Sequence, residues 1–310
     1  MGKWTADQIP DLKGKTAIVT GANSGLGYDT ALELARRHAH VVLACRSRDK
    51  TEKAMQEMRK AAPQALLEFM ALDLSDLASV RSFAKAFLAK HARLDLLCNN
   101  AGVMALPFGK TKDGFEMQIG TNHLGHFALT GLLLERLQST PGSRVMNVAS
   151  LAHNWTRGLD LDDLNWERKR YSKWDAYGKS KLANLTFTFE LDRRLKKSGS
   201  KVLTVAAHPG YSATNLGYVG PAQEKSAVGK FIMNVGNTLL AQSAAMGALP
   251  SLYAATMPDI QGGDYIGPDG FRQLKGYPKK VGCRRIARDP EIGTRLWELS
   301  EKLTGVSYLG

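Results

Sequence analysis

The chain has 310 residues, of which 44% are hydrophobic, so it is long enough to form one large α/β domain with a sizeable core. Its formal net charge is +13, but the basic residues are scattered and no helix-turn-helix, zinc-finger or aromatic RNA-binding pattern accompanies them. A nucleic-acid partner is therefore not expected. The charge leaves open a basic solvated surface, attraction for a phosphate-rich cofactor, an acidic partner, or peripheral contact with an anionic membrane.

The cysteines and the apolar runs indicate the cellular compartment of the protein. Three widely spaced cysteines without a CxxC pair favour a reducing compartment over a disulfide framework. The first fifteen residues contain no apolar signal core, and no run reaches the roughly 20 apolar residues that span a bilayer. We expect a cytoplasmic protein, with a peripheral position on a membrane as the alternative.

Short apolar runs alternate along the chain with longer amphipathic runs. The short runs predict strands at 16–20, 40–45, 66–74, 94–98, 144–149 and 202–207. The longer runs predict helices at 25–38, 49–60, 79–90, 114–137 and 176–197. This alternation predicts an α/β fold: a single-domain, Rossmann-type, doubly wound parallel sheet of about seven strands with helices on both faces.

The predicted domain has three parts and no linker. A cofactor-binding part covers about 12–150, a catalytic and substrate-binding part about 150–270, and a C-terminal extension about 271–310. Beyond Pro209 the alternation weakens, with helical spacing from about Ser226, and residues 211–250 are expected to form the wall of the substrate pocket. This segment could be a mobile lid or two ordinary surface helices. Its apolar residues are Tyr218, Val219, Phe231, Ile232, Met233, Leu239, Leu240 and Met246.

A glycine-rich turn joins the first predicted strand to the first helix. Its sequence is Thr-Gly-Ala-Asn-Ser-Gly-Leu-Gly over 20–27. Glycine lets a phosphate approach backbone N–H groups, and the helix N-terminus adds a favourable dipole. We expect Gly21 to make the turn, Gly25 to admit a pyrophosphate, and Gly27 to let the helix pack on the strand.

Two spaced residues and a serine suggest proton transfer. Tyr177 and Lys181, at i and i+4, share one face of a predicted helix, where an ammonium would lower the pKa of the phenol. Ser150 ends the fifth strand, at the sheet edge where ligands bind. The alternatives are an amphipathic helix with a surface lysine, and a serine that caps a helix.

Two polar segments complete the pattern. Residues 99–102 (Asn-Asn-Ala-Gly) follow the fourth strand and suit a floor beneath a ribose, or an ordinary turn. Asn122 and its neighbouring glycines are poor helix-interior residues and predict a distorted helical turn that orders a water. His123 and His126 have no third ligand nearby, so no metal site is expected.

Taken in order, these segments resemble the short-chain dehydrogenase/reductase family, and most closely its retinol dehydrogenase-like branch. The matching pieces are TGANSGLG at 20–27, ACR at 44–46, LDLSD at 72–76, NNAG at 99–102, NHLGHF at 122–127, NVASLAH at 147–153, YGKSKLAN at 177–184 and HPG at 208–210. The likeness covers about residues 12–215. It departs from the family pattern at Ala149, where a serine is often found, and after HPG, where Thr214 follows Tyr211-Ser212-Ala213.

The resemblance implies a role for each matching residue. Tyr177 would be the catalytic acid/base, Lys181 its activator and a ribose ligand, Ser150 the donor to the substrate oxygen, and Asn122 the proton-relay residue. The implied cofactor-binding residues are Gly21, Asn23, Ser24, Gly25, Leu26, Gly27, Arg46, Asp73, Leu74, Asn99, Ala101, Gly102, Tyr177, Lys181, Pro209, Gly210 and Thr214.

The end of the second strand selects the cofactor. A carboxylate there would bind both ribose hydroxyls of NAD, whereas an arginine would pair with the 2′-phosphate of NADP. The chain has Arg46 at this position, followed by Ser47 and Arg48, with no acid before Asp49. NADP(H) is therefore predicted over NAD, the alternative being that these arginines only face solvent.

We expect an enzyme that interconverts an alcohol with an aldehyde or ketone. The apolar residues of 211–250 and the resemblance suggest a hydrophobic substrate of retinol-like or long-chain carbonyl type. Three other functions are alternatives: a cofactor-binding regulator without turnover, a membrane-surface protein and a light-driven pigment reductase. By analogy with the family, the helices at 114–137 and 176–197 are expected to pair between copies in a homodimer or homotetramer.

Overall fold

The fold is built around one sheet. In this computed structural model, which describes residues 3–211 and 242–310, the strand order is β3-β2-β1-β4-β5-β6-β7-β8. The strands are β1 (Thr16–Thr20), β2 (His40–Cys45), β3 (Leu66–Ala71), β4 (Leu96–Asn99), β5 (Arg144–Val148), β6 (Leu203–Ala207), β7 (Tyr265–Pro268) and β8 (Pro278–Lys280). All neighbours pair in parallel except β7 and β8. The predicted doubly wound sheet is confirmed, with a short antiparallel strand added at one edge.

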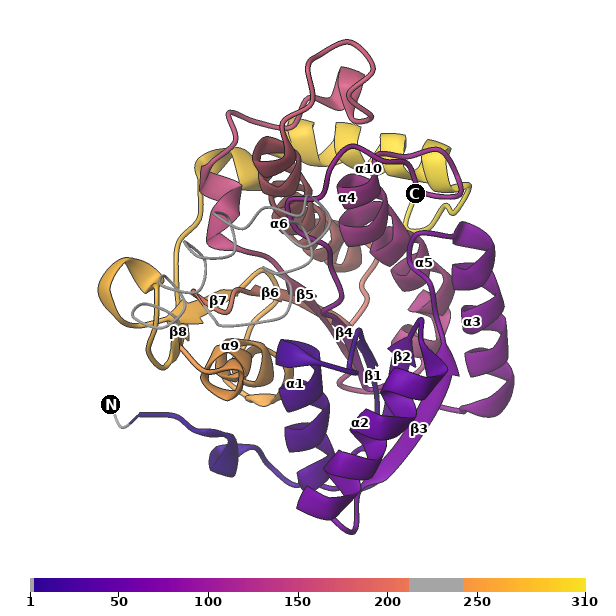
Figure 1. The fold of residues 1–310 in the computed structure, drawn as a ribbon, viewed down its shortest axis with the longest axis vertical. Helices are drawn as coiled ribbons and strands as arrows, with labels where there is room; N and C mark the ends of the chain where they lie inside the picture. The colour runs from indigo at the N-terminus through magenta and orange to yellow at the C-terminus, as the bar shows by residue number, and fades with distance from the viewer. Residues whose placement is uncertain (1–2, 212–241) are drawn as a thin grey trace.

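Helices cover both faces of the sheet (Figure 1). One face carries α1 (Gly25–Arg36), α2 (Arg48–Ala61) and α9 (Ala244–Thr256). The other carries α3 (Leu77–Lys90), α5 (Gly125–Gln138) and α6 (Lys173–Lys197). In β1, Ala17 and Val19 face the first helical layer and Ile18 faces the second, because successive side chains of a strand alternate between the two faces.

The last helix, α10 (Pro290–Thr304), covers the outer side of α5 and α6. Its Trp297 is fully buried, with its ring centroid 5.1 Å from Phe127 of α5 and 5.9 Å from Phe187 of α6. The sequence predicted that these two helices pair between copies. The chain's own C-terminal helix occupies that face, so pairing through it would require α10 to move; the oligomeric state itself stays a prediction.

The other boundaries differ from the predictions in instructive places. The third strand ends at Ala71 rather than 74, and the helix predicted at 114–137 is divided into α4 (Met117–Ile119), a π-helical turn (Gly120–Leu124) and α5. The sequence did not predict β7, β8 or α10. Short 3₁₀ turns occupy Ala6–Gln8, Leu151–Asn154, Leu161–Asp163, Phe271–Gln273 and Arg285–Arg288.

Two further predictions can be compared with the described part of the chain. Cys45, Cys98 and Cys283 are all free thiols, as expected. Among the described residues, no helix has the length and apolar character needed to cross a membrane. Of the helical spacing predicted between Ser226 and residue 250, the part up to 241 lies outside the described residues, and α9 begins in the remainder.

This strand order creates a crevice. The chain runs outward from β1 to β2 and β3, and then returns to place β4 on the other side of β1. In open α/β sheets, ligands bind at this point of reversal, outside the carboxyl ends of the strands. The glycine-rich turn after β1 and the Asn-Asn-Ala-Gly segment after β4 meet there.

Candidate active site

A cavity of about 400 Å³ lies at the carboxyl ends of β1, β4, β5 and β6. Its lining combines residues predicted from the sequence with residues that were not. The predicted ones are Gly21, Asn23, Ser24, Gly25, Leu26, Gly27, Ala101, Gly102, Ser150, Tyr177, Lys181, Pro209 and Gly210. The glycine turn and the three predicted proton-transfer residues therefore share one cavity.

The glycine turn has a shape that side chains would destroy. Gly21 adopts φ +67°, and a Cβ there would lie 3.0 Å from the Cβ of Ala101. A Cβ on Gly27 would lie 2.5 Å from the carbonyl oxygen of Gly21. The turn leads directly into the twelve-residue helix α1, whose first backbone N–H groups have no partner within the helix. These residues fit the pyrophosphate of a dinucleotide.

Thr20 joins this turn to the segment after β4. Its buried hydroxyl accepts hydrogen bonds from the backbone N–H groups of Asn100 and Ala101, both at 2.9 Å. The Asn100 side chain in turn donates to the Thr20 carbonyl at 2.8 Å. The two loops that face each other across the crevice are thus held as one unit.

Tyr177, Ser150 and Lys181 come together from β5 and α6. Tyr177 is buried and hydrogen-bonded to the Ser150 hydroxyl. The oxygen of that hydroxyl accepts a separate hydrogen bond from the Ala152 N–H at 3.2 Å. Ser150 therefore both caps a 3₁₀ turn and contacts the phenol. The Lys181 Nζ lies 5.9 Å from the centroid of the Tyr177 ring and donates to the Val148 carbonyl at 3.0 Å.

Burial controls the ionisation of this pair. It raises the pKa of Tyr177 to about 12, while the hydrogen bond from Ser150 opposes that shift. It lowers the pKa of Lys181 to about 8. The prediction that the ammonium lowers the tyrosine pKa is wrong for this structure: desolvation dominates, and the ammonium is bonded to a backbone carbonyl rather than to the phenol. Tyr177 is consequently a protonated donor at neutral pH.

Asn122 lies behind the cavity rather than in its lining. The distorted turn expected around it is the π-helical turn. Its side chain donates to the Val103 carbonyl at 2.9 Å and to the Ser180 hydroxyl at 2.8 Å, and accepts from the Val103 N–H at 2.8 Å. A Cβ on Gly102 would lie 3.2 Å from Asn122 Oδ1 and 3.5 Å from Lys181 Nζ, so both side chains approach this glycine closely.

The two histidines near Asn122 have separate structural partners. His126 connects the Thr20 hydroxyl, 3.0 Å from its Nε2, with the Asn122 carbonyl, 3.0 Å from its Nδ1. Its pKa is lowered to about 4 by burial, so it is neutral. His123 instead contacts the Ser300 hydroxyl of α10 at 2.9 Å. The two imidazoles are therefore held by separate groups of the protein.

Some predicted cofactor residues lie outside the cavity lining. Asn99 is buried between layers and donates to Thr130 at 3.1 Å and to Asn147 at 2.8 Å, so its side chain does not form the expected floor. Asp73 accepts from the N–H and hydroxyl of Ser75, at 3.0 and 2.6 Å. Leu74 is buried against α5, where its carbonyl would meet a Cβ on Gly125. Thr214 lies outside the described residues, and Arg46 is exposed just beyond β2.

One side of the cavity is apolar, and of it the sequence predicted only Tyr211, at the start of the 211–250 wall. It is formed by Met104, Leu151, Trp155, Trp174, Tyr211 and Leu274. Trp155 and Trp174 are 61% and 43% exposed and pack edge to face, with centroids 5.8 Å apart. Their positions close to Ser150 and Tyr177 in the chain could have revealed them. Of the other predicted pocket residues at 211–250, Met246 packs against the core of the first helical layer, and the rest lie outside the described residues.

The fold and this cavity define a class of nicotinamide-dependent oxidoreductases. The family model for short chain dehydrogenase matches residues 15–159. The chain is 53% identical over 300 residues to retinol dehydrogenase 11 of Mus musculus, covering 95% of this chain and 88% of that protein. It is 42% identical over 301 residues to retinol dehydrogenase 13 of Homo sapiens, covering 95% and 86%.

A solved structure agrees with these relatives. The crystal structure of an uncharacterized protein from Mycobacterium Paratuberculosis matches with a TM-score of 0.82 and 45% identity, covering 99% of both chains. The chain belongs to the short-chain dehydrogenase/reductase family, in its retinol dehydrogenase-like branch. It is an oxidoreductase enzyme that binds a nicotinamide cofactor and acts on a small-molecule substrate, as the sequence predicted.

Proposed function

We propose that this enzyme is an NADP(H)-dependent oxidoreductase that interconverts a hydrophobic alcohol with its aldehyde or ketone. One observation carries the proposal: Tyr177, hydrogen-bonded to Ser150, lines the same cavity as Lys181 and the glycine turn. A substrate oxygen in that cavity can meet a proton donor while its carbon faces the cofactor. We also propose that residues 1–310 form one catalytic domain.

The residues of the glycine turn and Lys181 would hold the nicotinamide cofactor, which would supply the chemistry of hydride transfer at the substrate carbon. Ser150 and Tyr177 hold the substrate oxygen, and the protonated phenol of Tyr177 donates its proton as negative charge develops there during carbonyl reduction. In the reverse direction, during alcohol oxidation, the phenol oxygen of Tyr177 accepts the proton of the alcohol hydroxyl. Lys181 provides positive charge near the cofactor ribose and the Tyr177 phenol. Asn122 lies across Gly102 from the Lys181 ammonium and belongs to the proton path behind that ammonium.

Replacing Tyr177 by phenylalanine tests this assignment. The hydroxyl is lost with little change in volume, so turnover should fall by about 10²- to 10⁴-fold while cofactor binding is kept. Tyr253→Phe is the matched control, because Tyr253 lies on α9, outside the cavity lining, and donates its phenol proton to Asp259. Turnover by Tyr177→Phe equal to that of the control would remove Tyr177 from the mechanism.

Arg46 supports the choice of NADP(H). It follows β2 directly and is exposed, whereas the neighbouring Arg48 is bound to Glu52 at 3.1 Å and stacks on Phe69 at 4.6 Å. Within the described residues, Arg46 has no such ion pair and is available to a 2′-phosphate. Arg46→Ala should raise the dissociation constant for NADPH far more than that for NADH, and Arg48→Ala should change both little. Equal effects of Arg46→Ala on the two cofactors would refute the assignment.

The aromatic and aliphatic side of the cavity supports an apolar substrate. Trp155, Trp174 and Leu274 offer a surface that a long or ring-containing hydrocarbon can cover. A panel of carbonyls assayed with NADPH should show turnover of retinoids or long-chain aldehydes, and Trp155→Ala should raise their KM more than that of a short aldehyde. Turnover confined to small polar substrates would contradict the apolar pocket.

A further inference from the structure

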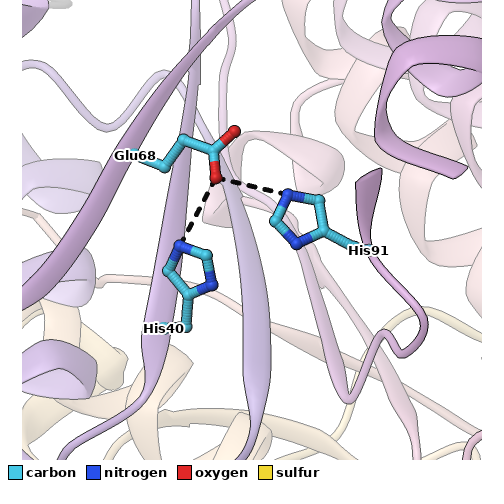
Figure 2. A group of neighbouring side chains, drawn as sticks. All are labelled: His40, Glu68 and His91. Atoms are coloured by element: carbon cyan, nitrogen blue, oxygen red, sulfur yellow. Dashed lines mark ion pairs between the residues drawn. The ribbon is translucent and has the colours of Figure 1, made fainter. Parts of the chain in front are cut away.

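A second cluster of chemistry-bearing side chains lies far from the cavity in the fold. His40 is the first residue of β2, Glu68 lies on the adjacent strand β3, and His91 ends α3 (Figure 2). One ligand atom from each of these residues lies within 4.8 Å of the other two. The cavity opens at the carboxyl ends of the strands, whereas His40 marks the amino end of β2, so the cluster is separate from the catalytic machinery.

The distances in the cluster are longer than those of charge-assisted hydrogen bonds. The Nε2 atoms of His40 and His91 lie 3.4 and 3.3 Å from the same carboxylate oxygen, Oε2 of Glu68. A charge-assisted N–H···O bond is about 2.7–2.9 Å long. Two ligands bound about 2.0–2.2 Å from a tetrahedral ion lie about 3.3–3.6 Å apart. The observed spacings therefore match the edges of a metal tetrahedron better than they match hydrogen bonds.

His91 provides an independent observation. Its side chain is only 8% exposed, and its Nε2 is a buried nitrogen without a hydrogen-bond partner in the described structure, although it points at Glu68. The ring is held there by stacking on Phe87, with centroids 4.6 Å apart. A buried polar atom left without a partner is costly, and a metal ion would satisfy it.

The charges around the cluster permit a divalent cation. The other carboxylate oxygen of Glu68 accepts from Lys90 Nζ at 2.9 Å, which leaves Oε2 for the ion. Lys90 is 62% exposed and can turn into solvent as a cation enters.

From this geometry we propose that His40, Glu68 and His91 form a divalent-metal site, best suited to Zn²⁺, with water at the fourth position. Two imidazoles and one carboxylate are a ligand set that zinc uses in proteins. The ion would link β2, β3 and the end of α3, elements that are otherwise joined through backbone pairing, packing and the exposed Lys90–Glu68 ion pair. Its effect is therefore on stability, because an ion bound only by the folded state raises the unfolding temperature.

Titration of the metal-free protein with Co²⁺ and Zn²⁺ tests the site. We expect one Co²⁺ per chain with the intense visible absorption of a four-coordinate ion, its displacement by Zn²⁺, and a higher unfolding temperature with Zn²⁺. His40→Gln, whose side chain is partly exposed, and the isosteric Glu68→Gln should each weaken binding by more than the roughly 10- to 100-fold that follows loss of an outer-shell partner.

His38→Asn is the matched control. It removes a nearby imidazole that is paired with Asp11 at the surface, and asparagine tolerates the positive φ of 69° at this position. The control should bind like the original protein, and turnover should be unchanged in all variants whose circular dichroism shows a folded state. The proposal is overturned if the unaltered protein binds neither ion, or if folded His40→Gln and Glu68→Gln retain its affinity.

Discussion

Replacing Gly27 by alanine separates the two tasks of the glycine turn, packing and cofactor binding. The added Cβ would lie 2.5 Å from the Gly21 carbonyl oxygen and 2.4 Å from the Asn100 side-chain nitrogen, whereas ordinary contact begins at 3.4 Å. The start of α1 and the turn must therefore separate by about 0.9 Å, the shortfall in the contact to Gly21. Overpacking of this kind costs about 1–3 kcal/mol.

This overpacking energy affects both the free energy of unfolding and the binding of NADPH. Alanine in a helix recovers up to about 1 kcal/mol relative to glycine, so the free energy of unfolding should fall by only about 0–2 kcal/mol. The displaced atoms line the cofactor cavity, however. If about 1.4 kcal/mol of the distortion energy is lost from the binding free energy of NADPH, the dissociation constant for NADPH rises tenfold.

Fluorescence titration with NADPH and urea unfolding measure the two effects separately. In Gly131→Ala a Cβ on α5 would lie 2.3 Å from the Tyr308 ring, outside the cavity lining, so stability should fall while the dissociation constant stays unchanged. Gly109→Ala meets nothing within 4 Å and should change neither quantity. Unaltered NADPH affinity in folded Gly27→Ala would refute the close approach of turn and cofactor.

Two further substitutions test the buried polar groups of the site. Lys181→Met should abolish turnover yet stabilise the fold. Burial lowers the pKa of Lys181 from 10.5 to about 8, which is equivalent to about 3 kcal/mol of folding stability. The Val148 carbonyl, which the lysine would no longer contact, keeps the Asn184 amide as a donor. Between these pKa values the unfolded lysine holds the proton that the folded one has lost, so the original protein becomes more stable as pH rises. The advantage of Lys181→Met should therefore be full below about pH 8 and vanish towards pH 10.5 in urea unfolding; an advantage constant with pH would contradict the burial argument. Thr20→Val removes the acceptor of two backbone N–H groups at almost constant volume, and should cost about 1–3 kcal/mol of stability and weaken NADPH binding; unchanged urea unfolding would show that those groups find another partner.

Much of the fold and part of the site were predictable, for a local reason. Parallel strands buried on both faces need continuous apolar runs, and the helices between them need amphipathic ones, so β1, β2 and α1 could be placed within a few residues. The glycine turn was equally clear, since it depends on the left-handed conformation of Gly21 and on the absence of a side chain at Gly27. The position of Lys181 on the same face of α6 as Tyr177 follows from helical periodicity, because the two residues are four positions apart.

Other features depend on contacts between distant residues. The pKa of Tyr177 moved in the direction opposite to that predicted, because burial, which no local pattern reports, outweighed its charged neighbour. Asn99 was assigned to the cavity from its place in a motif, yet its side chain faces Asn147 between the layers. The coverage of α5 by Trp297 likewise joins segments far apart in the chain.

The amino-acid sequence alone determined the order of the first six strands and of the helices between them, the phosphate-binding turn and the residue types available for proton transfer, because each depends on neighbours within about one helical turn. Only the tertiary structure decided which of those residues share a cavity and how burial sets their charge. It also brought His40, Glu68 and His91 together. Sheet pairing placed the first two on adjacent strands and helix packing supplied the third, so their spacing along the chain gave no sign of a common site.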